Sequence, residues 1–94
     1  MPIKNLTLNQ TALGPTPWVG IDPAKKRTIQ VVIVGAATVD IEASNNNRDS
    51  VAMLGATNIT ASCGFADDAA WQQMRVNVKS ITNGASVSVI VGEP

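Results

Sequence analysis

The stretch WQQMRVNVKSITNGASVSVIV, residues 71–91, decides the fold class. Every second residue from 74 to 78 is apolar, and every second residue from 87 to 91 is a valine. Alternation with a period of two is typical of β-strands that bury one face. Asn83-Gly84 lies between the two runs and is the favoured pair for a tight turn with positive φ. The stretch therefore predicts two antiparallel strands folded back on each other as a hairpin.

The region before this stretch carries the same kind of signal. Residues 28–34 (TIQVVIV) are apolar on both faces, which predicts a strand that is covered on both sides. Residues 37–44 (ATVDIEAS) alternate cleanly, with Thr38, Asp40 and Glu42 expected on the outer face. A Gly-Ala turn separates these two predicted strands.

Further strands are expected between residues 45 and 70. The Asn- and Asp-rich run 45–49 predicts a turn, because these side chains cap nearby amides and tolerate a left-handed backbone. Residues 50–54 are expected to return antiparallel, and 57–62 form a further strand candidate. Residues 63–70 predict either a loop or one helical turn opened by Asp67-Asp68.

Together these elements predict an all-β fold, a small antiparallel β-sandwich or barrel of about six to eight strands. The three aromatic residues, Trp18, Phe65 and Trp71, are expected to plug the ends of the core. The predicted core contains one row of alternating aliphatic residues from each strand: Ile33, Val39, Ile41, Val76, Val78 and Val89.

The first 23 residues are the least regular part. Residues 3–8 are compatible with a short first strand, but the prolines at 15 and 17 lack amide donors and break it. We therefore expect an irregular N-terminal arm and first strand over residues 1–23, followed by a β-sandwich over 24–94. At 94 residues the whole chain is expected to be one domain.

The composition narrows the functional classes. Seven basic and seven acidic residues give a formal net charge of zero, so no basic face for nucleic acid is expected. The one basic cluster, Lys25-Lys26-Arg27, is interpreted as a solvated entry to a strand. No run approaches the ~20 apolar residues of a bilayer span, and no signal peptide is recognisable, so neither a membrane association nor export is expected.

The candidate residues for catalysis or metal binding are one cysteine and two pairs of acidic residues. The single cysteine, Cys63, can form no internal disulfide and has no histidine to activate it, because the chain lacks histidine. Asp40 and Glu42 lie on one strand face about 7 Å apart, the spacing of an inverting glycosidase pair, but alternating charge is ordinary on a wet strand face. Asp67-Asp68 lacks the neighbouring oxygen ligands of a calcium loop. We expect no enzyme activity and no catalytic, cofactor-binding or metal site.

The stretches ATVDIEASNNNRDSVAML and WQQMRVNVKSITNGASVSVIV resemble a pattern found in small virion proteins of tailed bacteriophages. In that pattern an alternating strand, an Asn/Asp-rich turn and a returning strand precede a strand of the form W/Y-x-x-[IM]-R-[VA]-N-V. The resemblance covers roughly residues 28–91. The chain departs from it at the turn, where Asn46-Asn47-Arg48 replaces the usual Asp-Gly.

The resemblance implies a β-sandwich that decorates or cements the capsid shell, or a head–tail accessory piece. Its expected partners are the lattice of the major capsid protein and further copies of itself, as a trimer or dimer. It would be made in the host cytoplasm and located on the virion surface. The alternative is a small binding module for a carbohydrate or receptor. Apolar residues of the N-terminal segment are the expected contacts with the shell: Ile3, Leu6, Leu8, Leu13 and Trp18.

Overall fold

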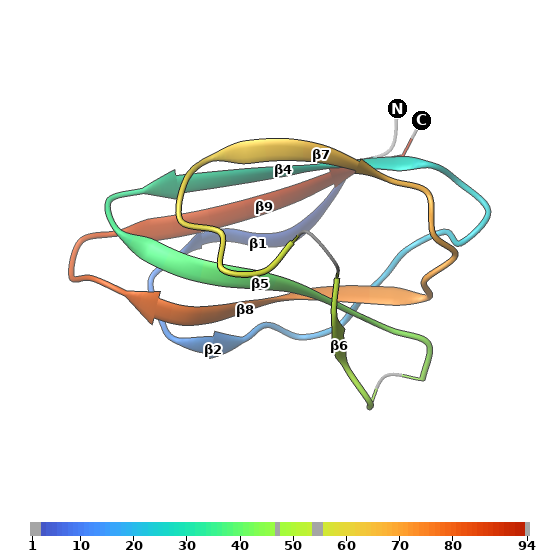
Figure 1. Ribbon diagram of the computed structural model, residues 1–94, viewed down its shortest axis with the longest axis horizontal. Helices are drawn as coiled ribbons and strands as arrows, with labels where there is room; N and C mark the ends of the chain where they lie inside the picture. Colours follow the sequence, from blue (N-terminus) through green and yellow to red (C-terminus); the bar gives the residue numbers. More distant parts are fainter. Residues whose placement is uncertain (1–2, 47, 54–55, 94) are drawn as a thin grey trace.

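The computed structural model describes residues 3–46, 48–53 and 56–93. These residues form nine strands in two antiparallel sheets that face each other (Figure 1). Sheet A has the order β1-β9-β4-β7, and sheet B has the order β2-β8-β5-β6, with β3 also paired to β8. The strands are β1 (Ile3–Gln10), β2 (Gly14–Pro15), β3 (Val19–Gly20), β4 (Arg27–Val34), β5 (Ala37–Ser44), β6 (Val51–Ala52), β7 (Cys63–Asp67), β8 (Gln73–Ile81) and β9 (Ser86–Gly92).

The core lies between the two sheets and confirms the predicted all-β sandwich. Alternate residues of β8 and β9 are buried, as the period of two requires. Five of the six predicted core residues are at most 1% exposed, and Ile33 is partly buried against them. The strand count exceeds the predicted six to eight because three of the nine strands are only two residues long.

The predicted hairpin of residues 71–91 is wrong. A turn does form at Asn83-Gly84, where the amide of Ala85 donates to the Thr82 carbonyl at 3.1 Å and Gly84 has a φ of 84°. However, β8 belongs to sheet B and β9 to sheet A, so the turn is an arch that carries the chain from one layer to the other. Two strands that each bury one face can pair edge to edge or face each other across the core, and both arrangements satisfy the same alternation.

The connection between β4 and β5 is a second arch, and it packs against the first. A Cβ at Gly35, whose φ is 83°, would lie 2.9 Å from the Cβ of Ala85. The amide and the hydroxyl of Thr82 both donate to the Ala36 carbonyl, at 3.0 and 3.1 Å. The two arches therefore close the same end of the sandwich together.

The N-terminal segment is part of the sandwich: the first strand expected over residues 3–8 forms as β1, and the part expected to be an irregular arm pairs with β8. β1 is eight residues long and pairs antiparallel with β9, and Leu6 is only 4% exposed in the core. The chain then crosses to sheet B, where residues 14–20 run along β8. The Thr16 amide, between the two prolines, donates to the Val76 carbonyl at 2.8 Å. Prolines 15 and 17 thus shorten the pairing into two small strands without detaching the segment.

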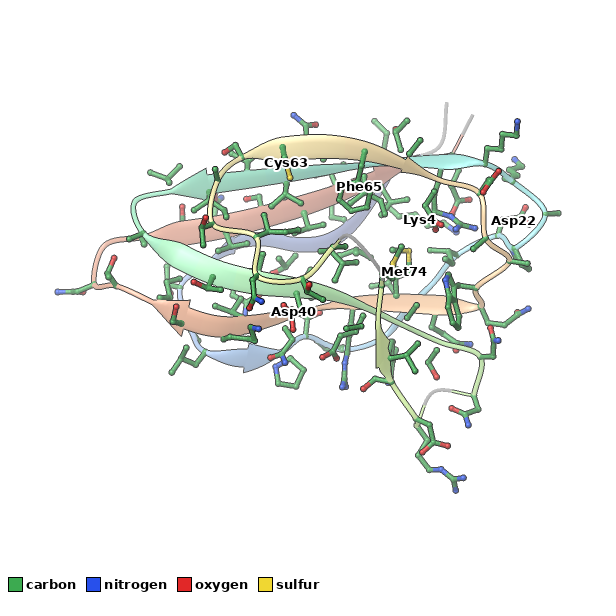
Figure 2. The ribbon with its side chains drawn as sticks, in the orientation of Figure 1. Lys4, Asp22, Asp40, Cys63, Phe65 and Met74 are labelled. Atoms are coloured by element: carbon green, nitrogen blue, oxygen red, sulfur yellow. The ribbon has the colours of Figure 1, made fainter. Side chains whose placement is uncertain are left out.

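The region between β5 and β8 differs most from the prediction. Residues 63–67 form a strand, β7, where a loop or a helical turn was expected. Phe65 on β7 packs against the core (Figure 2), so its expected contact with the core is present. The predicted strand over 57–62 is wrong, because only Ile59 forms an isolated bridge, to Val39. The predicted return over 50–54 is a two-residue strand beside β5, with residue 54 outside the described residues.

The predicted turn over 45–49 is organised by one asparagine. The side-chain carbonyl of Asn46 accepts the amides of Arg48 and Asp49 at 3.1 and 2.9 Å. Such side-chain capping is the reason Asn-rich runs form turns. Asn47, also within the predicted turn, lies outside the described residues.

Candidate functional site

The outer face of sheet B carries a network of ion pairs. Glu42 on β5 lies opposite Arg75 on β8, and its Oε1 accepts from the Arg75 Nε at 2.7 Å. Asp40 on the same face pairs with Lys79 at 3.2 Å. Each carboxylate also accepts from an amide: Asp40 from the Asn58 backbone at 2.8 Å, and Glu42 from the Asn77 side chain at 3.2 Å.

These partners decide what Asp40 and Glu42 can do chemically. Both point outward, as predicted, but Asp40 is only 9% exposed and both are held by a cation. Their carboxylate oxygens are already engaged by a lysine, an arginine and amide donors on the same face. The pair is therefore arranged as a cross-strand charge ladder that ties β5 to β8.

Trp18 lies on the same outer face, and its predicted place in the core is wrong. The guanidinium carbon of Arg75 lies 4.3 Å from the centre of the Trp18 ring, at the distance of a cation–π contact. The same guanidinium donates from its Nη2 to the Ser50 hydroxyl at 3.3 Å. Pro17 interrupts the pairing beside β8, so the chain turns the indole outward between the short strands β2 and β3. Trp18 remains partly exposed.

The outer face of sheet A is different in kind, because it carries no charged side chain among the described residues. Inward residues of β4 and β9 are the odd-numbered ones, so the even-numbered ones and their paired neighbours point outward. We call this set the sheet A outer face: Ile3, Asn5, Thr28, Gln30, Val32, Val34, Gly64, Ala66, Ser86, Ser88, Ile90 and Gly92. Ile3 and Val34 are 64% and 59% exposed.

The five predicted contact residues do not form one surface. Ile3 belongs to the sheet A outer face, and Leu8, further along β1, is also exposed. Leu13 is exposed in the connection between β1 and β2. Leu6 is buried in the core, and Trp18 lies on the opposite sheet. Residues 28–34 did signal this surface from the sequence, since the run is apolar on both faces, but only the sheet order places its outward valines beside Ile90 of β9.

The expectation that Lys25-Lys26-Arg27 is a solvated cluster is wrong for Arg27. Its side chain is fully buried, while Lys25 and Lys26 are exposed. The Arg27 Nη1 donates to Asp67 Oδ2 at 2.5 Å and to the Ala69 carbonyl at 2.9 Å, and Nη2 donates to the Asp22 carbonyl at 3.0 Å. Arg27 occupies an inward position of β4, in phase with Ile29 and Val31, so the alternation carries its side chain inside.

The same end of the sandwich holds a second buried charge. Glu93 is 2% exposed; its Oε1 lies 3.4 Å from the Lys4 Nζ and accepts the Asp22 amide at 3.2 Å. Figure 2 shows Lys4 and Asp22 together at this end. Arg27 and Glu93 thus tie the connections that enter and leave the strands, which is a structural role.

Two shallow cavities lie near this end. One, of about 280 Å³, is lined by Lys26, Arg27, Ala66, Asp67 and Asp68, whose charges cancel. The other, of about 350 Å³, is lined by Ala52, Met53, Asp67, Ala69 and Trp71. Asp67 borders both, but its carboxylate is engaged by Arg27. Neither cavity assembles a nucleophile with a base.

Within the described ranges, no three potential metal-ligating side chains of His, Cys, Asp or Glu gather at one place. Cys63 on β7 is an exposed free thiol. The part of the chain that the structure describes also contains no helix with the length and apolar character needed to cross a bilayer. Comparison with known protein families, with curated proteins and with solved structures finds no match to this chain.

Proposed function

We propose that this chain is a non-enzymatic structural protein of a bacteriophage virion, which decorates or cements the capsid shell through the sheet A outer face. The phage assignment rests on the resemblance of residues 28–91 to small virion proteins. The choice of contact surface rests on the difference in charge between the outer faces of the two sheets. Among the described residues, the ion pairs on an outer sheet face, Glu42–Arg75 and Asp40–Lys79, both lie on sheet B, while the sheet A outer face has none.

An uncharged β-sheet face is suited to a protein partner. Exposed Ile3 and Val34 flank the half-buried Val32 and Ile90, and the remaining outward side chains are small or carry neutral amides. Burying such a face costs little desolvation of charge, and contiguous apolar patches often mark interaction sites. The N-terminal contribution expected from the sequence is then made by β1 as a strand of this sheet, through Ile3, rather than by a free arm.

Co-sedimentation with virions tests the proposal. Purified particles of the phage that encodes the chain, stripped of it, would be mixed with the wild-type protein, with Val34→Glu or with Ser80→Glu. Val34 and Ser80 are both exposed strand residues, but Ser80 belongs to sheet B. We expect the wild type and Ser80→Glu to pellet with the particles and Val34→Glu to stay in solution. Equal attachment of both variants, or no attachment of the wild type, would refute the proposed surface or the proposed function respectively.

A second candidate, a carbohydrate-binding module, is favoured by one observation. Trp18 is partly exposed beside Arg75, Glu42 and Asn77, and sugars are bound by an aromatic ring together with polar side chains. This candidate predicts that a glycan array gives binding that is lost in Trp18→Ala and retained in Val34→Glu. The shell proposal predicts the reverse dependence for attachment to particles.

A further inference from the structure

Among the described residues, β7 is the one edge strand that pairs regularly and has no feature that would block pairing with a further strand. β1 is guarded by two register shifts and by Asn9, which has a φ of 50°. The margin formed by β2 and β3 contains Pro15 and Pro17. Irregular strands and prolines are the devices by which proteins prevent edge pairing.

The margin of sheet B beyond β5 is also covered. β6 is only two residues long, and the chain that follows it lies along β5. The Val39 amide donates to the Ile59 carbonyl at 3.0 Å, and the Ile41 amide donates to the Ala56 carbonyl at 2.9 Å. β7, by contrast, pairs with β4 over five residues without a register shift and forms the upper margin of the molecule in Figure 1.

The hydrogen bonds of Ser62 reveal which backbone groups of β7 point outward. The Ile33 amide donates to the Ser62 Oγ at 2.9 Å, so the backbone groups of Ile33 face the β7 side of β4. Because this direction alternates along a strand, Ile29 and Val31 also face β7 and bond to Phe65 and Cys63.

Gly64 and Ala66 consequently direct their N–H and C=O groups away from β4, toward the open margin. Both residues are exposed, and a glycine and an alanine offer no bulky side chain against an approaching strand. The margin is therefore a short row of two donors and two acceptors in a regular strand, which is the template for pairing with another chain.

We propose that β7 pairs antiparallel with β7 of a second copy of this chain. With Phe65 opposite Phe65 of the second copy, Gly64 faces Ala66 on both sides, and the four outward groups of each strand make four hydrogen bonds. This register is self-complementary, as a two-fold interface requires. It places Asp67, which Arg27 already neutralises, opposite the uncharged Cys63, so no like charges meet.

The pairing would join the two A sheets into one eight-stranded sheet. The two-fold axis of an antiparallel pair stands perpendicular to the sheet, so both sheet A outer faces would lie on the same side. The pairing itself stands on the backbone geometry, and only its use, which is to present two uncharged faces to one partner surface, rests on the proposed function.

Disulfide trapping tests the register. In a Cys63→Ser background, Gly64→Cys and Ala66→Cys chains would be mixed under mild oxidation. Facing Cα atoms in this register lie about 5.5 Å apart, within disulfide reach. Two copies of the same residue would be about 8 Å apart, beyond it. We expect a mixed disulfide dimer on a non-reducing gel and little homodimer from either chain alone. Equal trapping in all combinations, or none, would overturn the proposal.

Sedimentation equilibrium of the full chain provides the second test. We expect a dimer that forms as the concentration rises toward about 1 mM, the range of weak association. Ala66→Pro should abolish it, because it removes an outward N–H but no bond to β4, while Ala66→Ser keeps the N–H and should preserve the dimer. Circular dichroism would check that both variants fold. A wild-type chain that stays monomeric, or a dimer that Ala66→Pro leaves intact, would contradict the pairing. Because no virions are present, failure here is separate from failure of the proposed function.

Discussion

Arg27 is the residue on which one end of the sandwich depends. Its buried guanidinium reaches the carbonyl of Asp22, five residues earlier, and the Asp67 side chain and Ala69 carbonyl, 40 and 42 residues later, so it ties residues 22–27 to residues 67–69. A buried ion pair adds little over an apolar pair of the same shape, but removing one partner leaves a charge without compensation. Replacing Arg27 alone is therefore expected to lower the free energy of unfolding substantially.

We expect Arg27→Met to lower the free energy of unfolding by about 3 kcal/mol or more, because the largely buried carboxylate of Asp67 is left without its cation. Urea denaturation followed by tryptophan fluorescence would measure the change. Lys26→Met is the matched control, since Lys26 is the exposed neighbour and should stay within about 0.5 kcal/mol of the wild type. Equal losses in the two variants would show that Arg27 has no special role.

Gly35 is the second residue with a specific requirement. A methyl group there would meet the Cβ of Ala85 at 2.9 Å in a backbone with a φ of 83°. We expect Gly35→Ala to cost about 1–3 kcal/mol by crowding and backbone strain. Gly20→Ala should be close to neutral, because nothing lies within 4 Å of its added Cβ. Thermal melts of the two variants test this, and a Gly35→Ala protein as stable as Gly20→Ala would argue against the packed arches.

Among the elements, β1 is the one whose role changes most with the structure. It covers the edge of β9 and contributes Leu6 to the core, so it stabilises the sandwich as well as extending its outer face. Deletion of residues 2–13 is therefore expected to destabilise the domain, where an arm would have been dispensable.

Leu6→Ala and Leu8→Ala distinguish a strand from an arm. Leu6 is 4% exposed and Leu8 is 55% exposed, although both lie on β1. We expect Leu6→Ala to lose about 2–5 kcal/mol of unfolding free energy and Leu8→Ala to lose less than about 0.5 kcal/mol. Chemical denaturation would compare them. If both variants unfolded at the wild-type midpoint, β1 would not be docked in the free protein.

The strands show which features of the fold the sequence predicts. The alternation in 73–81 and 86–92 identified the strands and their inward faces correctly, because it reports which side of each strand is buried. Alternation does not report which strands pair edge to edge, so the sequence favours a hairpin where the structure has the arch at Asn83-Gly84. β7 escaped detection because Gly64 and Ala66 have low strand propensity and only the pairing with β4 makes them extended.

The sequence predicts the sheet A outer face only in part, because the apolar pattern shows single strands and not their neighbours. Residues 28–34 are apolar on both faces, which indicates that Val32 and Val34 contact something other than the core. Their proximity to Ile3 and Ile90 depends on the order β1-β9-β4, which is a long-range property of the chain. The burial of Arg27 was signalled by its phase with Ile29 and Val31, but the neighbouring lysines favoured a solvated interpretation.

The two outer faces of the sandwich differ in chemical character. Sheet B carries paired charges and the Trp18–Arg75 contact, which suit a face in water. Sheet A carries small, neutral and aliphatic side chains, which suit a face in contact with protein. Pairing of two β7 strands would double the second face without changing the first.

Hydroxyl-radical footprinting of the protein, free and on virions, tests the sheet A contact most directly. Side chains that become covered react more slowly, and peptide mass spectrometry reports each of them. On particles we expect strong protection of Ile3 and Val34, both exposed in the free protein, and unchanged reactivity of Trp18 on the opposite sheet. Protection of Trp18 with unchanged Ile3 and Val34 would contradict the assignment of the binding face to sheet A.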